Sequence, residues 1–361
     1  MFDACIIGAC GIVGAAIARE LAEHGLSVAG LEKHESPCQE TSGLNSRVIH
    51  SGFHEIPGTL KANLAREGAS LISRYAEERG IKLMKTGMLI AIPHGGIREG
   101  LWKDVDALWR LWTQSRRQGI PFQFLVSPSR VRKIAPVQAL GGIFIPSVCV
   151  IDLEALASSL TEDARRAGAQ LFYGSEVTSI GVDGCNYVIE SSNGQFRAPI
   201  AINSAGLRAH EISRLAGGPD YKVEFLRGDY YELAGGVDRW NIRTLIYPAM
   251  PPRSASKGIH FGPHTDGRLY IGPSASPPSS PVGKEVFLQA GRRFLPGLTR
   301  DDLEWAYAGI RPKISDSGKP DFVIRVERHH PMLINLIGID SPGLSASMAI
   351  AAYVRGLIGR Q

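Results

Sequence analysis

Two histidines and an arginine are the side chains in this sequence best suited to chemistry. The imidazoles of His50 and His260 can take up a proton near neutral pH. The guanidinium of Arg311 can form a bidentate pair with a carboxylate, which a lysine cannot reproduce. Together these groups would suit general acid–base chemistry on a small acid. The competing interpretations are ordinary ones, because a lone histidine is often structural and an arginine is often ion-paired at the surface.

The charge and the cysteines restrict the partners of the chain. Its 361 residues carry 40 Lys and Arg against 35 Asp and Glu, a net charge of +5, and no basic run is interleaved with aromatic residues. We therefore expect a small anionic substrate and no nucleic acid. Five scattered cysteines without C-x-x-C spacing argue against a disulfide framework. No metal site is expected, because His329 and His330 have no further ligand at a suitable spacing.

The sequence predicts a cytoplasmic protein. It enters an apolar strand directly after Met1-Phe2-Asp3, with no basic segment and cleavage site before that strand. No apolar stretch approaches the roughly 20 residues that cross a membrane, so no transmembrane segment is expected. Peripheral association with a membrane and the oligomeric state stay open.

A glycine-rich turn between an apolar strand and a helix marks the amino-terminal unit. Residues 4–7 predict a buried strand, a helix follows the turn, and residues 26–31 predict a second strand that ends at Glu32. This order is typical of a dinucleotide-binding unit, in which glycines let the backbone approach a pyrophosphate at the helix amino terminus. Glu32 would accept hydrogen bonds from the ribose hydroxyls. The turn residues with this role are Gly8, Ala9, Gly11, Ile12, Val13 and Gly14.

The turn departs from a strict G-x-G-x-x-G motif. Ala9 fills the first position when Gly11 and Gly14 are aligned with the motif. No second fingerprint of this kind occurs downstream. Flavoprotein reductases that take electrons from a nicotinamide usually carry two, so we expect this chain to draw electrons directly from a substrate.

Several short blocks follow the amino-terminal unit along the rest of the chain. They are residues 41–52 (TSGLNSRVIHSG), 57–62 (PGTLKA), 227–233 (RGDYYEL), 246–248 (IYP), 258–261 (GIHF), 271–273 (IGP), 308–313 (AGIRPK) and 339–347 (IDSPGLSAS). These blocks resemble, in family order, those of the D-amino-acid-oxidase-like flavoprotein superfamily, and most of all its L-2-hydroxyglutarate oxidase/dehydrogenase branch. Arg47 and the pair His54-Glu55 depart from the family pattern, which leaves the identity of the substrate open.

The resemblance implies a mixed α/β (α+β) fold, in which a Rossmann-like FAD-binding domain carries an inserted antiparallel-sheet substrate domain. The FAD-binding domain would comprise residues 1–80, 146–220 and 326–361. The substrate domain would comprise residues 81–145 and 221–325. Apolar residues at helical spacing predict helices over 59–79, 101–118 and 153–167, and residues 192–194 predict the turn of a hairpin.

The resemblance also implies which residues contact FAD. Thr41, Ser42, Asn45 and Ser46 would lie along the cofactor, with Val177 near the adenine. Gly343, Leu344 and Ser345 would introduce a helix whose amino terminus faces the pyrimidine side of the flavin, where negative charge accumulates on reduction. Lys33, Ala205, Gly206 and Gly309 complete the expected cofactor site.

The implied reaction is the oxidation of a small 2-hydroxy acid, similar to L-2-hydroxyglutarate, to the 2-oxo acid. A hydride would pass to flavin N5 and a proton to His50, while Arg311 holds the carboxylate and His260 assists. Tyr247, Tyr230 and Tyr231 would line the substrate side, although neighbouring residues of a strand point to opposite faces. Arg47 would pair with a second acid of the substrate or contact the cofactor.

Other functions stay open at this level. A glycine or sarcosine oxidase would need a neutral amine, whereas glycerol 3-phosphate would need several basic groups. His50 could instead tether the flavin covalently, and a flavin-binding subunit without turnover is a further alternative. The electron acceptor could be oxygen, a quinone or an electron-transfer protein, because the second half-reaction leaves little mark in short motifs.

Overall fold

The computed structural model describes residues 1–93, 101–250, 257–314 and 321–359 and contains two large sheets. The first is a mostly parallel sheet that includes the first strand of the chain. Its strand order is β19-β20-β13-β1-β2-β9, and only β19 runs antiparallel to its neighbour. All residues of β1 and β2 are buried, which is typical of strands covered on both faces. The strands are β1 (Ala4–Ile7), β2 (Val28–Leu31), β9 (Gln170–Phe172), β13 (Ile200–Asn203), β19 (Val323–His329) and β20 (Met332–Ile337).

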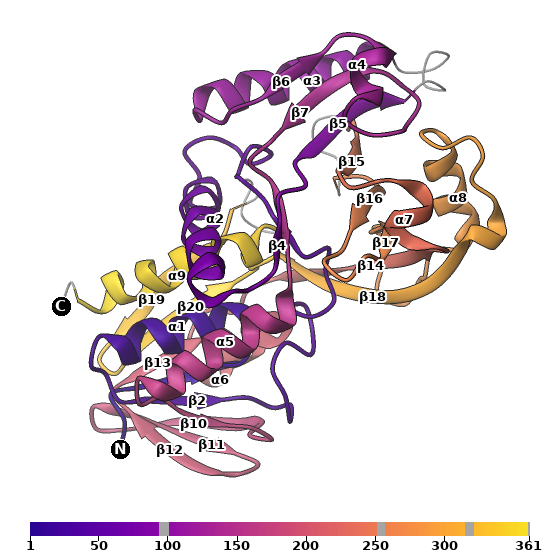
Figure 1. Cartoon of the computed structure of the whole chain (residues 1–361). Coiled ribbons are helices and arrows are strands. Elements are labelled where there is room, and N and C mark those ends of the chain that lie inside the picture. The colour runs from indigo at the N-terminus through magenta and orange to yellow at the C-terminus, as the bar shows by residue number, and fades with distance from the viewer. Residues whose placement is uncertain (94–100, 251–256, 315–320, 360–361) are drawn as a thin grey trace.

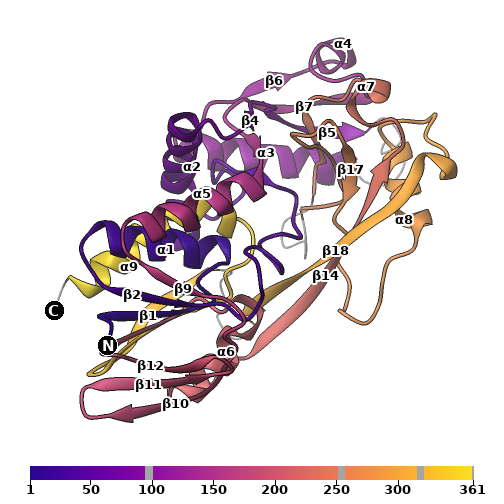
Figure 2. The same cartoon turned by 60° about the horizontal axis from the view of Figure 1, so that its bottom comes forward.

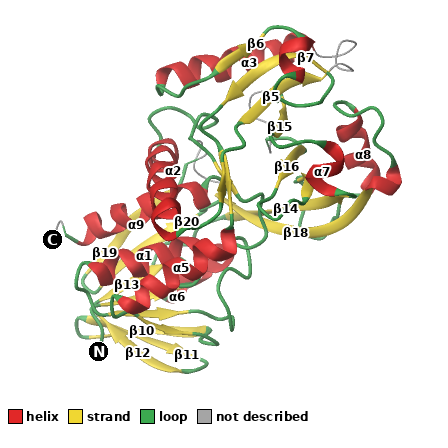
Figure 3. Cartoon of the chain, viewed as in Figure 1, coloured by secondary structure: helices red, strands yellow, loops and turns green. Residues whose placement is uncertain are grey.

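Helices cover one face of this sheet and a small antiparallel sheet covers the other (Figure 3). Ala4 and Ile6 of β1 pack with the helices, whereas Cys5 and Ile7 pack toward the small sheet. The helices are α1 (Ile12–Glu23), α2 (Leu60–Arg79), α5 (Leu153–Arg166) and α9 (Gly343–Ile358). The small sheet holds β10 (Val177–Asp183), β11 (Asn186–Ser191) and β12 (Gly194–Ala198), and α6 (Ala209–Leu215) with the short helix η2 (Gly206–Arg208) lies nearby.

The second large sheet has eight strands, is mostly antiparallel, and has the order β18-β14-β17-β16-β15-β5-β7-β6. Its two longest strands, β14 and β18, extend from this sheet toward the nucleotide side (Figure 2). The strands are β5 (Met88–Pro93), β6 (Gln123–Leu125), β7 (Ala139–Ile145), β14 (Val223–Leu233), β15 (Leu245–Pro248), β16 (His260–Pro263), β17 (Leu269–Gly272) and β18 (Leu303–Ile314). The helices around it are α3 (Leu101–Arg117), α4 (Pro128–Arg132), α7 (Gly236–Trp240), α8 (Lys284–Arg292) and η3 (Arg300–Asp302).

A three-stranded sheet, β3-β8-β4, connects the two parts (Figure 1). It consists of β3 (Val48–Ile49), β8 (Cys149–Ile151) and β4 (Leu83–Met84). Because β3 leads directly into His50, this small sheet fixes where that imidazole enters the space between the large sheets.

The mixed α/β fold predicted from the sequence is confirmed, and the three predicted helices correspond to α2, α3 and α5. The predicted domain boundaries differ from the strands in two details. Strand β4 pairs with β8 and not with the large antiparallel sheet, and β19 begins at Val323, ahead of the expected boundary at residue 326. In the described part of the chain, no helix is both long and apolar enough to cross a membrane.

Candidate active site

A cavity of about 1210 Å³ lies between the two large sheets. Gly8 and Glu32, at the ends of β1 and β2, line it on one side. Tyr247, His260 and Arg311 of the eight-stranded sheet line it on the other. All residues that the sequence assigned to the cofactor line this cavity except Ala9 and Ser345. The predicted nucleotide-binding residues and the side chains predicted to take part in the reaction therefore line the same cavity.

The glycine turn lets three stretches of backbone approach one another. Gly8 has a φ of 79°, and a Cβ at this position would lie 2.7 Å from the carbonyl oxygen of Ser204. A Cβ on Gly14 would collide with the carbonyl oxygen of Gly8. Gly11 gives helix α1 no side-chain cap of its own, and Ser42 accepts the hydrogen bond of the Ile12 N–H. The first-turn residues Ile12, Val13 and Gly14 line the cavity. Such a terminus fits a pyrophosphate.

The turn also corrects the expectation for Ala9. Its side chain is fully buried and points toward β2, since a Cβ on Gly30 would lie 2.7 Å from the Cβ of Ala9. Its N–H donates to the carbonyl of Leu31 at 3.0 Å. Ala9 therefore packs the first strand against the second and does not reach the cavity.

Glu32 is buried at the end of β2 and faces the turn. Its carboxylate accepts hydrogen bonds from the N–H of Cys10 at 3.3 Å and from that of His34 at 3.1 Å. A carboxylate has about four acceptor positions, so capacity remains for two hydroxyl groups. The ammonium of Lys33, next to it, contacts Glu40 at 2.6 Å.

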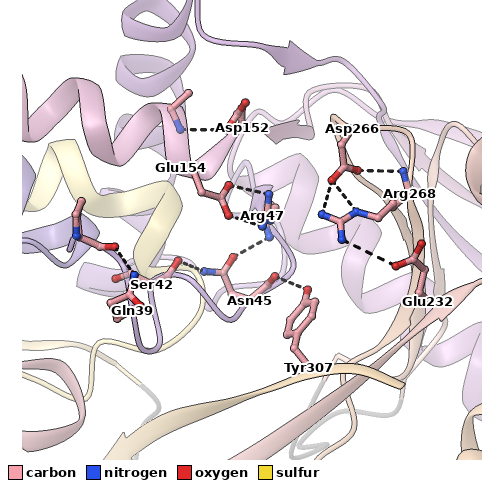
Figure 4. A network of polar contacts seen from close by, with 12 residues as sticks. Gln39, Ser42, Asn45, Arg47, Asp152, Glu154, Glu232, Asp266, Arg268 and Tyr307 are labelled. Atoms are coloured by element: carbon pink, nitrogen blue, oxygen red, sulfur yellow. Dashed lines mark hydrogen bonds and ion pairs between the residues drawn. The ribbon is translucent and has the colours of Figure 1, made fainter. Parts of the chain in front are cut away.

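The loop after β2 binds the turn to the long strand β18. Ser42 accepts a hydrogen bond from the N–H of Ile12 at 3.0 Å, and Thr41 donates to the carbonyl of Ile310 at 3.0 Å. Tyr307 donates to the carbonyl of Asn45 at 2.9 Å, as Figure 4 shows. The loop therefore connects the nucleotide side with the substrate side.

Arg47 does not reach the cavity, which contradicts its expected substrate contact. Its N–H donates to Asn45 at 2.7 Å, and its backbone has a φ of 56°. This conformation directs the guanidinium toward Glu154, with which it forms two hydrogen bonds of 2.8 and 2.5 Å (Figure 4). Arg47 is therefore paired with Glu154 outside the cavity, and its buried Nε has no hydrogen-bond partner among the described residues.

Three histidines and a tyrosine form a buried aromatic group at the cavity. The ring of Tyr247 stacks on that of His260 with centroids 3.8 Å apart, and His50 lies 6.5 Å from Tyr247. His54, which the sequence flagged only as a departure from the family, lies 6.1 Å from His50. The ring of His50 lines the cavity, and its Nδ1 is a buried atom without a hydrogen-bond partner among the described residues.

The buried histidines are uncharged at neutral pH. Burial lowers the pKa of His50 well below 6.5, and the positive charge of Lys257 lowers it further. The same two causes lower the pKa of His54. Burial lowers the pKa of His260 to about 3. A neutral imidazole can accept a proton, so His50 is available as a base over a wide pH range.

Arg311 enters the cavity from β18. One terminal nitrogen donates to the carbonyl of Ser274 at 2.8 Å, and the buried Nε has no partner among the described residues. Gly228 of β14, which pairs with Gly309, lies beside Arg311, since a Cβ there would lie 3.4 Å from the guanidinium. A guanidinium held at one corner can use its other donors for an anion.

Lys257 is a cation of the cavity that sequence reasoning missed. Its Nζ lies 3.3 Å from the carboxylate of Glu55 and donates to Ser341 at 3.3 Å. Burial lowers its pKa. Lys61, which pairs with Asp340, lines the same region. The sequence held one indication of these residues, because Lys257, Lys61 and Asp340 lie beside or inside the blocks that resemble the family. Their local sequence, however, does not distinguish them from charged residues at the surface.

The two neighbouring tyrosines of β14 have different surroundings, as their alternation along a strand predicts. Tyr230 lines the cavity, and its hydroxyl lies 2.9 Å from that of Ser46. Tyr231 packs against Phe287 in the core, with ring centroids 4.7 Å apart. Tyr231 is therefore not a substrate contact.

Helix α9 begins at the cavity with Gly343 and has no side-chain cap. Ser345 lies one turn inside and is fully buried. Its hydroxyl accepts a hydrogen bond from the N–H of His50 at 2.8 Å. Ser345 thus holds the backbone of the candidate base and does not line the cavity.

A parallel sheet whose glycine turn and helix terminus face the same cavity as proton-accepting side chains defines a dinucleotide-dependent enzyme. The chain matches the family model of the FAD dependent oxidoreductases over residues 3–357. It therefore belongs to this family, uses FAD and is an oxidoreductase.

Several relatives are alike over most of the chain. It is 28% identical to glycerol 3-phosphate dehydrogenase from Caloramator mitchellensis, over 98% of this chain and 73% of the relative. It is 29% identical to mitochondrial L-2-hydroxyglutarate dehydrogenase from Arabidopsis thaliana, over 98% of this chain and 82% of the relative. Identity with the human protein of that name is 32% over 76% of this chain and 61% of the relative.

Solved structures share the whole fold. A dithionite-reduced L-α-glycerophosphate oxidase from Mycoplasma pneumoniae with FAD bound matches with a TM-score of 0.88 and 27% identity, covering 99% of this chain and 94% of that one. Glycine oxidase from Geobacillus kaustophilus matches with a TM-score of 0.82 and 24% identity, over 100% of this chain and 95% of that one.

Replacing Gly14 with alanine should abolish FAD binding. The new Cβ would collide with the Gly8 carbonyl and lie 2.8 Å from the Cα of Ala9, so the turn must open. We expect purified Gly14→Ala protein to lack the flavin absorbance of the natural chain. Gly356→Ala in α9 is the matched control, because its Cβ meets nothing within 4 Å, and it should keep the flavin. Full flavin content in Gly14→Ala would contradict the assignment of this turn.

Proposed function

We propose that the enzyme oxidises a small 2-hydroxy acid with a second anionic group, such as L-2-hydroxyglutarate, to the 2-oxo acid. The observation that carries the proposal is the neutral, unpartnered imidazole of His50 in a cavity that also holds Arg311 and Lys257. The relatives named L-2-hydroxyglutarate dehydrogenase support the same choice.

His50 would act as the general base. Oxidation of a secondary alcohol removes a hydroxyl proton and a hydride from the same carbon. The imidazole of His50 lines the cavity and would take the proton. Bound FAD supplies the acceptor for the hydride. His260 would shape the substrate side by its stacking on Tyr247 and is less suited to proton transfer, because its Nδ1 lies 3.1 Å from the carbonyl of Gly258.

Arg311 and Lys257 would hold the two acid groups. Both cations lower the pKa of His260, so both lie close to that ring. Arg311 would bind the carboxylate next to the reacting carbon with its free donors, while Lys257 would face the distal anion. Because Lys257 is already paired with Glu55, the distal anion would share the ammonium with that carboxylate.

The residues that hold FAD are proposed from the same geometry. The pyrophosphate would lie at the amino terminus of α1, Glu32 would bind the ribose hydroxyls, and the amino terminus of α9 would face the flavin. We further propose that the two large sheets belong to the cofactor domain and the substrate domain, with the last boundary moved to the start of β19.

Glycerol 3-phosphate is the second candidate. It also joins an anion to a secondary alcohol, and the relative from Caloramator mitchellensis bears that name. Amine oxidation is less well supported. The positive charge that helps to lower the pKa of His50 and of His54 would also disfavour a protonated amine in this cavity.

Anaerobic mixing with candidate substrates tests the reaction. We expect L-2-hydroxyglutarate to bleach the visible flavin absorbance faster than L-lactate, because lactate lacks the second anion. Glycine should cause no bleaching at neutral pH, because its amine is protonated. Bleaching by glycerol 3-phosphate alone would establish the second candidate, and bleaching by glycine alone would contradict both.

Arg311→Lys tests the carboxylate clamp at constant charge. Loss of the forked pair should raise the apparent dissociation constant of the hydroxy acid about 10- to 100-fold, since hydrogen bonds to charged groups contribute roughly 1.5–3 kcal/mol. The measurement is the concentration dependence of the flavin reduction rate. Arg300→Lys on η3, where the side chain is 69% exposed, is the control. An unchanged dissociation constant in Arg311→Lys would contradict the proposed role of Arg311 in binding the carboxylate.

His50→Asn tests the base. The rate of flavin reduction should fall about 10²- to 10⁴-fold, the usual contribution of general base catalysis. The exposed His24 supplies the control variant His24→Asn. In the natural protein the pKa of His50 lies well below 6.5, so the base stays unprotonated as the pH falls through 6.5. The reduction rate should therefore hold through that range and decline only at lower pH; a decline centred at or above pH 6.5 would contradict this protonation state.

A further inference from the structure

The outer face of α3 and the neighbouring edge strand β6 carry exposed apolar side chains, flanked by Trp112 and Phe122, which are partly buried against the core. Trp109 is 59% exposed, Phe124 is 45% exposed and Val126 is 75% exposed. Figure 1 shows α3, β6 and α4 together at the end of the molecule remote from both termini. The α3–β6 patch is defined as Val105, Trp109, Trp112, Phe122, Phe124 and Val126.

The patch is one continuous surface. Val105, Trp109 and Trp112 follow the spacing of a single helix face. The rings of Trp109 and Trp112 lie 4.2 Å apart, and Trp112 lies 6.3 Å from Phe124. Because β6 is the last strand in its sheet, no further strand of the described chain covers this edge.

The patch has no part in the proposed reaction. A different face of α3 carries Ala107, Leu111 and Gln114, which line the cavity, and none of the patch residues lines it. Large exposed aromatic groups on a soluble surface mark a site of interaction. The remaining question is what covers them.

The charge around the patch identifies the partner. Residues 101–139 contain seven basic residues and two acidic ones, so this segment alone accounts for the net charge of +5 and the rest of the chain is balanced. Asp104 is buried, and Asp106 pairs with Arg110 at 2.8 Å. The guanidinium of Arg116 lies 5.9 Å from the ring of Trp112. The exposed cations beside the patch are Arg116, Arg117, Arg130, Arg132 and Lys133.

We propose that the α3–β6 patch docks on the surface of an anionic lipid bilayer. Tryptophan is enriched at the headgroup level of membranes, where its apolar ring and polar N–H are both satisfied. Arginines beside it would bind lipid phosphates. A second copy of the chain fits less well, because a two-fold symmetric contact would bring this basic surface against an identical basic surface. The proposal goes beyond the reaction proposed above and does not depend on which substrate is oxidised.

Vesicle flotation of the FAD-loaded protein tests the proposal. We expect binding to vesicles of phosphatidylcholine mixed with phosphatidylglycerol, no binding to phosphatidylcholine alone, and release by high salt. Trp109→Ser and Arg117→Glu should each weaken binding about fivefold or more, from the apolar area removed and from about 1 kcal/mol for each surface cation. Flavin reduction by substrate should be unchanged in both variants, because neither residue lines the cavity.

Matched controls lie elsewhere on the same chain. Trp305 is 54% exposed on β18, the opposite edge strand of the sheet, and Trp305→Ser should bind vesicles as the natural protein does. Arg243→Glu is the matched charge control, since Arg243 is 69% exposed outside the patch segment. If Trp109→Ser does not fold, Arg117→Glu retains the test. Absence of binding to the anionic vesicles would overturn the proposal. So would equal losses in Trp109→Ser and Trp305→Ser, or a dimer that Trp109→Ser alone dissociates.

Discussion

The pairing of β14 with β18 is the constraint on which the site depends. These strands pair from Val223 with Ile314 to Leu233 with Leu303, so one ribbon runs from the substrate sheet to the nucleotide side. At Gly309 the ribbon has no side chain, and a Cβ there would collide with the carbonyl of Leu44. The loop of the nucleotide unit therefore lies directly against the strand that carries Arg311. Contacts between backbone atoms thus fix the position of Arg311 relative to this loop.

The cavity contains uncharged imidazoles beside a cation that is paired with a carboxylate. Burial keeps the imidazoles of His50 and His54 uncharged, and the ammonium of Lys257 reinforces that state. Lys257 remains in a buried place because Glu55 partly balances it. The cavity is therefore positive enough to attract an anion, while its bases stay able to accept a proton.

Much of the fold could be predicted from the sequence, because its signals are local. The run of buried residues before Gly8, the glycines of the turn and the helical spacing in α2, α3 and α5 each depend on near neighbours. The opposite orientations of Tyr230 and Tyr231 could also be predicted, because neighbouring residues of a strand point to opposite faces. Only the structure shows which of the two faces the cavity. The ion pair of Arg47 with Glu154 was not predicted, because the two residues lie 107 positions apart in the sequence. The pair of Lys257 and Glu55 was missed for the same reason, since a long-range ion pair has no local pattern.

The first and last segments of the chain meet at His50, the proposed base. Helix α1 lies beside α9 in one core (Figure 1), and strand β1 has β13 between itself and β20. Ser345 of α9 accepts a hydrogen bond from the backbone N–H of His50. During synthesis, residues 1–50 leave the ribosome long before residue 345 exists. The nucleotide-binding half therefore cannot be completed as the chain emerges, and the proton-accepting site becomes whole only after translation has passed α9.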